Sequence, residues 1–213
     1  MSIALPKAAF FDWDGTLADS FACIESAHDH ALGQLGQGAR AKGWFRSYFG
    51  KPRDYIYSDI YGEERIKAQA VFEAYLQQNH TRLVQPLAGV QAMLEAFQQA
   101  GVLMGVVTNK RADFVAAEIK AFGWEHFFET VVGAGEALED KPSAQPLYLA
   151  LERCGFDGEL DDVWFFGDTQ ADLDCAQGAG VKVVYYGAAR DESHILHCVD
   201  DYGAFLSFLQ QKG

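Results

Sequence analysis

The sequence lacks any hydrophobic run long enough to cross a membrane. A transmembrane helix needs roughly 18 consecutive apolar residues, and no stretch of this chain reaches that length without a charge. The first eleven residues, MSIALPKAAFF, lead directly into acidic residues and lack the layout of a signal peptide. We therefore expect no membrane partner and no secretion.

Positive charge is scarce as well. The chain has 17 Lys and Arg residues against 30 Asp and Glu residues, which gives a net charge of −13. An acidic surface repels the phosphate backbone of DNA and RNA. This balance argues against a nucleic-acid partner.

Cysteine is rare and unpatterned. Cys23, Cys154, Cys175 and Cys198 stand apart, with no C-x-x-C spacing. Isolated cysteines of this kind are typical of free thiols in a reducing compartment rather than of a disulfide framework or a zinc site. We predict a cytoplasmic protein.

Short apolar runs, by contrast, recur along the 213 residues. Five of them predict strands buried on both faces, at residues 8–11, 102–108, 129–133, 163–167 and 181–186. Helical patterns lie between or after them, at residues 89–100, 112–122, 143–154, 171–179 and 202–211. Strands that alternate with helices predict an α/β fold with a doubly wound parallel sheet covered by helices on both faces.

The alternation is interrupted once, between the first strand and Pro86. Roughly 65 residues there carry amphipathic helical patterns and no convincing strand. The return segment QPLAGV at 85–90 has the Pro and Gly of a loop that re-enters the core. We therefore predict a core made of residues 1–17 and 86–213, with a helical domain inserted at 18–85.

Polar residues cluster after the predicted strands. The carboxyl ends of parallel strands meet at one edge of a sheet, where ligands bind. The residues expected at that edge are Asp12, Asp14, Thr108, Asn109, Lys141, Asp168 and Asp172.

This mixture of side chains suits phosphoryl transfer. Hard oxygen ligands such as Asp12 and Asp168 can hold Mg²⁺, and the metal offsets the repulsion between neighbouring carboxylates. One carboxylate can attack phosphorus and form an aspartyl-phosphate, while a second exchanges protons with the leaving group and with water. Thr108 and Lys141 can supply donors and positive charge to the phosphoryl oxygens.

Each of these features also has a purely structural interpretation. The pair Asp12 and Asp14 can form Asx-turns in a loop. A lone lysine such as Lys141 is usually solvated. Asp168 and Asp172 can cap the N-terminus of a helix, and a cap at Asp168 is compatible with metal binding. Only the co-occurrence of all the groups favours a reactive site.

Four segments together resemble the motifs of the haloacid dehalogenase superfamily. They are D-x-D-G-T-L-x-D-S at 12–20, a hydrophobic residue followed by T-N at 107–109, K-P-x-x-x-P at 141–146 and G-D-T-x-x-D at 167–172. They occur in the superfamily's order and cover the core from residue 8 to about 187. The resemblance implies a Rossmann-like core and identifies the insertion at 18–85 as a helical cap.

The resemblance also implies roles for the acidic residues. Asp12 is expected to be the nucleophile, and Asp14 the general acid and base. Asp12, Asp168 and the backbone carbonyl of Asp14 are expected to bind Mg²⁺, with Asp172 supporting the metal site from behind.

The remaining motif residues are expected to contact the substrate. The resemblance implies that Thr108 and Asn109 bind the phosphoryl group, and that Lys141 stabilises it beside the nucleophile. Because the superfamily's dehalogenases lack an acid at the position of Asp14, the chain resembles the phosphatases and mutases instead. The segment GVVTNK at 105–110 is similar to phosphoglycolate phosphatases, while Trp13 replaces the commoner Phe or Leu.

We therefore expect a Mg²⁺-dependent phosphatase, monomeric or homodimeric, that hydrolyses a small phosphorylated metabolite such as phosphoglycolate through an aspartyl-phosphate. A phosphomutase of the β-phosphoglucomutase kind uses the same motifs and is the main alternative. A non-catalytic phosphate- or partner-binding module is disfavoured, because both Asp12 and Asp14 are retained.

The insertion carries one unusual segment, RAKGWFRSYFGKPR at 40–53. It holds five cations and no acid: Arg40, Lys42, Arg46, Lys51 and Arg53. The segment is either a solvated face or a cap surface that faces an anionic substrate. In the second case, Arg46 and Arg53 are the candidates for binding a substrate carboxylate, because a guanidinium can grip it with two hydrogen bonds.

Overall fold

The computed structural model describes residues 4–38, 40–48, 51, 53–190 and 195–212. The chain divides into two compact units, a larger one made of Met1–Asp19 and Pro86–Gly213 and a smaller one made of Ser20–Gln85. The insertion that the sequence places at 18–85 differs from the smaller unit by two residues at its start.

The larger unit is built on a six-stranded sheet in the order β5-β4-β1-β6-β7-β8, and the paired strands are parallel. The strands are β1 (Ala8–Phe11), β4 (Leu103–Val107), β5 (Thr130–Val132), β6 (Val163–Gly167), β7 (Lys182–Tyr186) and β8 (Ile195–Val199). The chain winds from the central β1 first toward β5 and then toward β8, which confirms the predicted doubly wound α/β fold.

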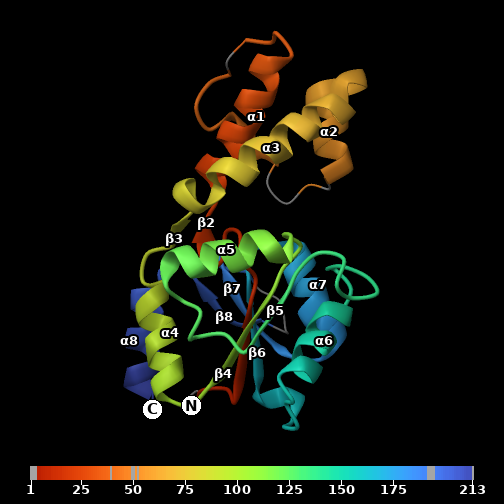
Figure 1. Cartoon of the computed structure of the whole chain (residues 1–213). Coiled ribbons are helices and arrows are strands. Elements are labelled where there is room, and N and C mark those ends of the chain that lie inside the picture. The colour runs from red at the N-terminus through yellow and green to blue at the C-terminus, as the bar shows by residue number, and fades with distance from the viewer. Residues whose placement is uncertain (1–3, 39, 49–50, 52, 191–194, 213) are drawn as a thin grey trace. The chain divides into compact units, whose positions relative to one another are not determined.

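Aromatic and aliphatic residues fill the two faces of this sheet differently. Phe10 packs with α6 (Gln145–Arg153) and α7 (Gln170–Ala179) in an aliphatic cluster. The neighbouring Phe11 points to the other face, as successive strand residues do, and its ring stacks on Phe166 at 4.7 Å. That face is covered by α4 (Val90–Gln99) and α8 (Tyr202–Lys212), which lie side by side in Figure 1. The α5 helix (Ala112–Phe122) packs near β5.

The edge strand β8 is absent from the sequence-based prediction. Its sequence, ILHCV, includes a polar histidine, and four of its five residues are only partly buried. Its register with β7 shifts between Val183 and Val184. An edge strand is buried on one side only, so it lacks the continuous apolar run that marks the central strands.

Two further strands, of two residues each, pair with one another where the chain leaves and re-enters the larger unit. They are β2 (Ala18–Asp19) and β3 (Gln85–Pro86). A backbone hydrogen bond of 2.9 Å from Leu87 to Leu17 continues this connection inside the larger unit. Strands this short carry no periodicity, so the sequence could not reveal them.

The smaller unit is helical, as expected. It contains α1 (Phe21–Gln34), α2 (Arg53–Tyr61) and α3 (Arg65–Leu83), together with the short 3₁₀ helices Trp44–Tyr48 and Gly62–Glu64. Its core surrounds His28, whose ring lies 4.3 Å from that of Phe45 and 4.5 Å from that of Phe72. Burial, aided by the charge of Arg40, lowers the pKa of His28 to about 3, so the ring is neutral.

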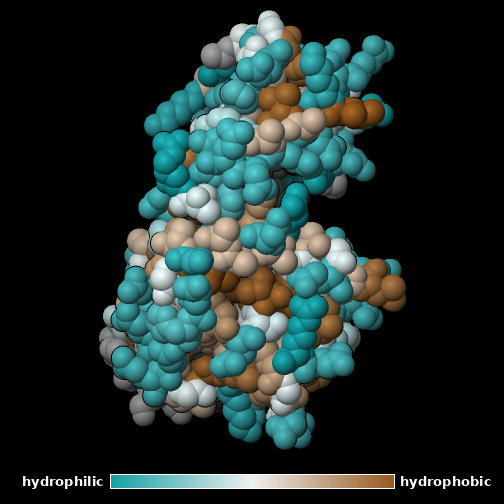
Figure 2. Space-filling view, viewed as in Figure 1, coloured by the Kyte–Doolittle hydropathy of each residue, from teal (hydrophilic) through white to brown (hydrophobic). Residues whose placement is uncertain are grey.

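On the face drawn in Figure 2, polar residues cover much of both units, and hydrophobic residues lie among the polar ones, most clearly across the larger unit. In the 19-residue α3, Ala68 and His80 are buried, Val71 and Phe72 are partly buried against the core of the smaller unit, and many of the other residues are exposed. Among the described helices, none combines the length and the apolar character that a membrane crossing requires.

Candidate active site

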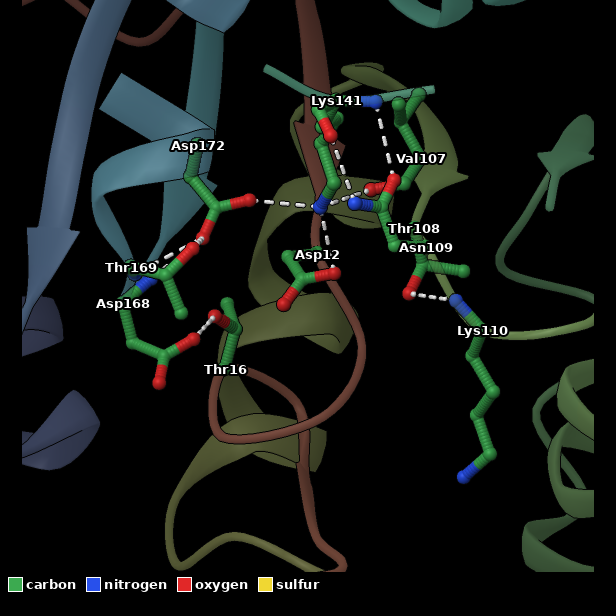
Figure 3. A network of polar contacts seen from close by, with 10 residues as sticks. All are labelled: Asp12, Thr16, Val107, Thr108, Asn109, Lys110, Lys141, Asp168, Thr169 and Asp172. Atoms are coloured by element: carbon green, nitrogen blue, oxygen red, sulfur yellow. Dashed lines mark hydrogen bonds and ion pairs between the residues drawn. The ribbon is translucent and has the colours of Figure 1, made fainter. Parts of the chain in front are cut away.

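The sheet brings all seven predicted core residues to one edge. Asp12 directly follows β1, and its amide donates to the carbonyl of Phe166 at 2.8 Å. Thr108 follows β4 and is held in the same way by the carbonyl of Val132 at 3.0 Å. Asp168 follows β6. The strand ends therefore place groups that are far apart in the sequence around one point (Figure 3).

Lys141 is the centre of this group. Its Nζ atom donates to Oδ1 of Asp12 at 2.7 Å, to Oδ1 of Asp172 at 2.6 Å and to the carbonyl of Val107 at 3.0 Å. Burial alone would lower the pKa of Lys141, but the two carboxylates raise it. Lys141 therefore remains an ammonium ion and fixes the direction of the Asp12 carboxylate.

Asp172 connects Lys141 to the loop that carries Asp168. Its second oxygen accepts hydrogen bonds from the amide of Asp168 at 3.2 Å and from the amide and hydroxyl of Thr169 at 2.9 and 2.6 Å. Thr169 and Asp172 form a capping box, so the N-cap of α7 is Thr169. Asp168 lies one residue before this N-cap, near the position expected from the sequence, and its carboxylate is free of the cap and is directed toward Thr16.

Negative charge exceeds positive charge around Asp12 and Asp168. Burial, reinforced by the charges of Asp12 and Asp172, raises the pKa of Asp168 to about 8, even though Thr16 donates a hydrogen bond to it at 3.1 Å. Burial likewise raises the pKa of Asp12 to about 6, and Lys141 offsets part of that effect. A cation bound here would relieve this repulsion.

The same residues fit a metal ion in their geometry. Asp12, Asp168 and Asp172 each offer a carboxylate oxygen, and these oxygens lie within 4.8 Å of one another. Figure 3 shows the second oxygen of Asp12 on the side of Asp168 and Thr16. Gly15 makes the approach possible, because a Cβ atom there would lie 2.4 Å from Oδ2 of Asp168. Oxygen-only ligands are the kind that Mg²⁺ prefers.

Asn109 holds the Lys141 segment. Its side-chain amide donates to the carbonyl of Lys141 at 2.8 Å and accepts from the amide of Lys141 at 3.0 Å. Both ends of the side chain are thus used within the protein, which favours a supporting role over the substrate contact expected from the sequence. The neighbouring Thr108 is buried, and its hydroxyl accepts from the amide of Lys110 at 3.2 Å.

Two tyrosines that the sequence analysis did not select support the catalytic loops. The hydroxyl of Tyr202 donates to the carbonyl of Thr16 at 2.8 Å, and that of Tyr185 donates to the carbonyl of Asp168 at 2.9 Å. The two tyrosines therefore fix the backbone on either side of the acidic cluster. One indication of this role was visible in the sequence: Tyr185 lies near the end of a buried strand, where its hydroxyl can reach the edge of the sheet.

Asp14 has a partner that sequence reasoning also missed. Its Oδ1 atom accepts from Nζ of Lys110 at 2.9 Å, and the same Nζ contacts Oε2 of Glu118 at 2.8 Å. Lys110 was visible as the last residue of GVVTNK, but nothing in the sequence related it to Asp14, 96 positions away.

The two arginines chosen from the basic segment belong to the smaller unit. The guanidinium of Arg53 is exposed, pairs with Glu73 at 2.5 Å and lines a pocket of about 350 Å³ together with Arg65. Arg46 lies over the ring of Phe21 at 4.5 Å. Binding of substrate by either residue stays a prediction.

Comparison with known proteins places the motifs in a family. The model of the haloacid dehalogenase-like hydrolases matches residues 9–186, which is most of the chain. A phosphoglycolate phosphatase of Shigella boydii is 32% identical over 220 residues, covering 88% of this chain and 86% of the relative. The pyrophosphatase PpaX of Bacillus velezensis is 30% identical over 175 residues, covering 82% of this chain and 80% of the relative.

Solved structures agree on the fold. A haloacid dehalogenase-like family protein of Streptococcus pneumoniae, SP0104, superposes with a TM-score of 0.81 at 20% identity. The match covers 97% of this chain and 99% of the other. At that identity the likeness shows a shared fold.

Proposed function

The chain belongs to the haloacid dehalogenase-like hydrolase family, and we propose that it is a Mg²⁺-dependent phosphatase that acts on a small organic phosphomonoester through an aspartyl-phosphate. The observation that carries this proposal is the buried carboxylate of Asp12, oriented by Lys141 and adjacent to Asp168. A carboxylate held in this way is ready to act as a nucleophile.

Substrate binding uses the charges already present at the sheet edge. Asp12, Asp168 and the backbone carbonyl of Asp14 are the groups that would hold Mg²⁺, which supplies positive charge to the phosphoryl oxygens. The Lys141 ammonium and the Thr108 hydroxyl supply donors from the protein side. Phosphoryl transfer depends mainly on this kind of positioning and charge stabilisation.

The first step forms the covalent intermediate. A carboxylate oxygen of Asp12 attacks phosphorus, and the bond between phosphorus and the ester oxygen breaks. Asp14 donates a proton to that oxygen, so the alcohol leaves in neutral form and Asp14 becomes a carboxylate.

The second step regenerates the enzyme. The Asp14 carboxylate takes a proton from water as the water oxygen attacks phosphorus. The bond between phosphorus and Asp12 breaks, which releases inorganic phosphate and restores the Asp12 carboxylate and the protonated Asp14. Lys141 donates to Oδ1 of Asp12 in the resting state and steadies the Asp12 side chain through both steps.

Phosphoglycolate is our first candidate for the substrate, since relatives that share about 30% of the sequence carry the name phosphoglycolate phosphatase. Its carboxylate would need a cation, and Arg46 and Arg53 are the candidates because a guanidinium can bind a carboxylate with two hydrogen bonds. A reducing compartment such as the cytoplasm fits the four free cysteines.

The test is phosphate release from a panel of small phosphorylated metabolites, measured with Mg²⁺ and with excess chelator. We expect release from phosphoglycolate or a similar small ester, lost in chelator and restored by Mg²⁺. Full activity in chelator would contradict the metal dependence. Release from no member of the panel would favour a binding module, and isomerisation of a sugar phosphate would favour a mutase.

A further inference from the structure

Glu118 is a buried charge that the proposed chemistry does not use. It lies on α5 with none of its surface exposed. A carboxylate in such a place is costly unless it is paired and hydrogen-bonded. Its Oε2 atom is in contact with Nζ of Lys110 at 2.8 Å and accepts a hydrogen bond from Nε1 of Trp13 at 2.5 Å.

Lys110 connects the buried carboxylate of Glu118 to that of Asp14, the proposed acid and base. The side chain of Lys110 is 11% exposed, and its Nζ lies between Glu118 and Asp14, whose side chain is 25% exposed. Burial would lower the pKa of Lys110, but the two carboxylates raise it, so the ammonium ion persists. Of its two partners, Glu118 is fixed in the interior, and Asp14 is partly exposed at the candidate active site.

Trp13 holds the chain on the same helix. It stands between Asp12 and Asp14 in the sequence, and its ring is fully buried. The ring stacks on Phe122 at 5.9 Å with an interplanar angle of 16°. Phe122 and Glu118 are four residues apart on α5 and therefore share a face of the helix. The helix thus holds Trp13 by stacking and by a hydrogen bond, and it holds the adjacent Asp14 through Lys110.

The two acidic residues of the D-x-D segment therefore have different lysines as partners. Asp12 is oriented by Lys141, and Asp14 by Lys110. A group that exchanges protons must lie within about 2.6–3.2 Å of its partner atom, and a partly exposed aspartate without a tether samples several rotamers. A tether to a buried anchor removes that freedom.

We propose that Lys110, anchored by Glu118 and Trp13, is a positioning residue that holds the Asp14 carboxyl group in place, so that the oxygen that carries the proton faces the leaving-group oxygen. This inference rests on the proposed role of Asp14. It predicts that loss of Lys110 harms substrates that need a proton at the leaving group, and spares those that do not. A misplacement of about 1 Å can cost on the order of 100-fold in rate.

The experiment compares kcat/KM for an alkyl phosphate with kcat/KM for p-nitrophenyl phosphate, whose leaving group hardly needs a proton. Lys110→Met leaves Glu118 buried without its lysine and can unfold the protein, so the main variant is Lys110→Met combined with Glu118→Gln. Trp13→Phe keeps an aromatic ring at this position but removes the indole donor together with part of the buried ring. The matched control is Lys120→Met, because Lys120 is an exposed lysine on α5, the helix that carries Glu118.

In the double variant, we expect the ratio of alkyl to p-nitrophenyl activity to fall by about tenfold to 100-fold, with phosphoenzyme accumulating in rapid-quench samples. Trp13→Phe should lower the ratio less, and Lys120→Met should leave it unchanged. Equal losses on both substrates would mean a merely structural role and would overturn the proposal.

Asp14→Asn separates this inference from the proposed function. If Asp14→Asn lowers the ratio and the double variant does not, Lys110 does not position Asp14, while the function stands. If Asp14→Asn leaves the ratio unchanged, the role of Asp14 and the inference built on it both fail.

Discussion

The larger unit buries ionised side chains in contact with one another, whereas the smaller unit buries a neutral histidine among aromatic rings. In the larger unit, Lys141 lies between Asp12 and Asp172, and all three are less than 10% exposed. In the smaller unit, the charge that acts on the ring of His28 is the like charge of Arg40, and its Nδ1 atom shares a hydrogen bond of 2.7 Å with the hydroxyl of Tyr61.

The difference follows from what each unit has to do. Buried ion pairs lose much of their attraction to the cost of desolvation, so they contribute little stability, but they fix the direction of each group. An aromatic core gains stability from its buried apolar area. The smaller unit still buries the carboxylate of Glu25, which accepts from two backbone amides, but cations of its basic segment lie at the surface. There, Arg40 stacks on Trp44 at 4.2 Å and Lys51 lies 5.0 Å from Tyr48. In the larger unit, the buried ion pairs of Lys141 fix the directions of side chains and add little stability. In the smaller unit, the aromatic core adds stability.

The largest expected effect is on Asp12, the proposed nucleophile of the larger unit. Asp12→Asn should reduce turnover below detection, because an amide is a poor nucleophile. The amide can still accept from Lys141, so the fold should persist. Phosphate release and circular dichroism measure both outcomes. Asp174→Asn, an exposed aspartate on α7, is the control and should remain active. Near-normal turnover in Asp12→Asn would refute the mechanism.

Removal of the central lysine should expose the cost of buried charge. Lys141→Met leaves Asp12 and Asp172 without their shared ammonium ion, and we expect the larger unit to lose about 3–5 kcal/mol of unfolding free energy. Hydrogen exchange measured along β1 and β6 should report the loss, while residues 20–85 should be unaffected. Lys7→Met, which breaks an exposed pair with Asp162, should change little. If Lys141→Met and Lys7→Met lower the free energy of unfolding equally, the buried position of Lys141 has no special effect on stability.

A substrate role for the smaller unit would sharpen the comparison. Arg53→Ala should lower kcat/KM for a carboxylated phosphate by about 1.5–3 kcal/mol, the scale of a hydrogen bond to a charged group. The loss should be small for p-nitrophenyl phosphate, which has no carboxylate. Arg46→Ala, in the same basic segment, provides the comparison. If neither variant affects either substrate, residues 40–53 form a solvated face.

The smallest effect concerns acid stability of the smaller unit. The pKa of His28 is about 3 in the folded protein and 6.5 when unperturbed, so the unfolded chain binds more protons between these values. Stability should therefore fall as the pH drops below 6.5, by about 1.4 kcal/mol at pH 5.5. Hydrogen exchange of residues 20–85 measures it. His28→Phe should remove the dependence, and the exposed His30→Gln should retain it. If His28→Phe keeps the same pH dependence of stability, a group other than His28 causes it.

The larger unit should respond to pH in the opposite direction when metal is removed by a chelator. The pKa values of Asp12 and Asp168 are about 6 and about 8, above the value of 3.8 for a free aspartate. The folded state therefore binds more protons than the unfolded state, and its stability should decrease as the pH rises through these values. Thermal melts of the chelated protein at several pH values test the sign. Added Mg²⁺ should weaken the trend.

The central strands were the easiest part of the fold to predict. The bounds of β1 and β6 agree with the sequence-based ranges residue for residue, because strands buried on both faces are continuous apolar runs. β8 escaped prediction because an edge strand is only half buried. The short strands β2 and β3 have no pattern long enough to read.

The sequence by itself determined which residues meet at the carboxyl edge of the sheet, since strand order and motif spacing leave few other arrangements. It could not decide what each residue contacts there. Only the tertiary structure shows that Lys110 pairs with Asp14, that Glu118 pairs with Lys110, and that Trp13 donates to Glu118. Trp13 and Glu118 are 105 positions apart. Local patterns set strands and caps, whereas contacts at that separation exist only once the chain has folded.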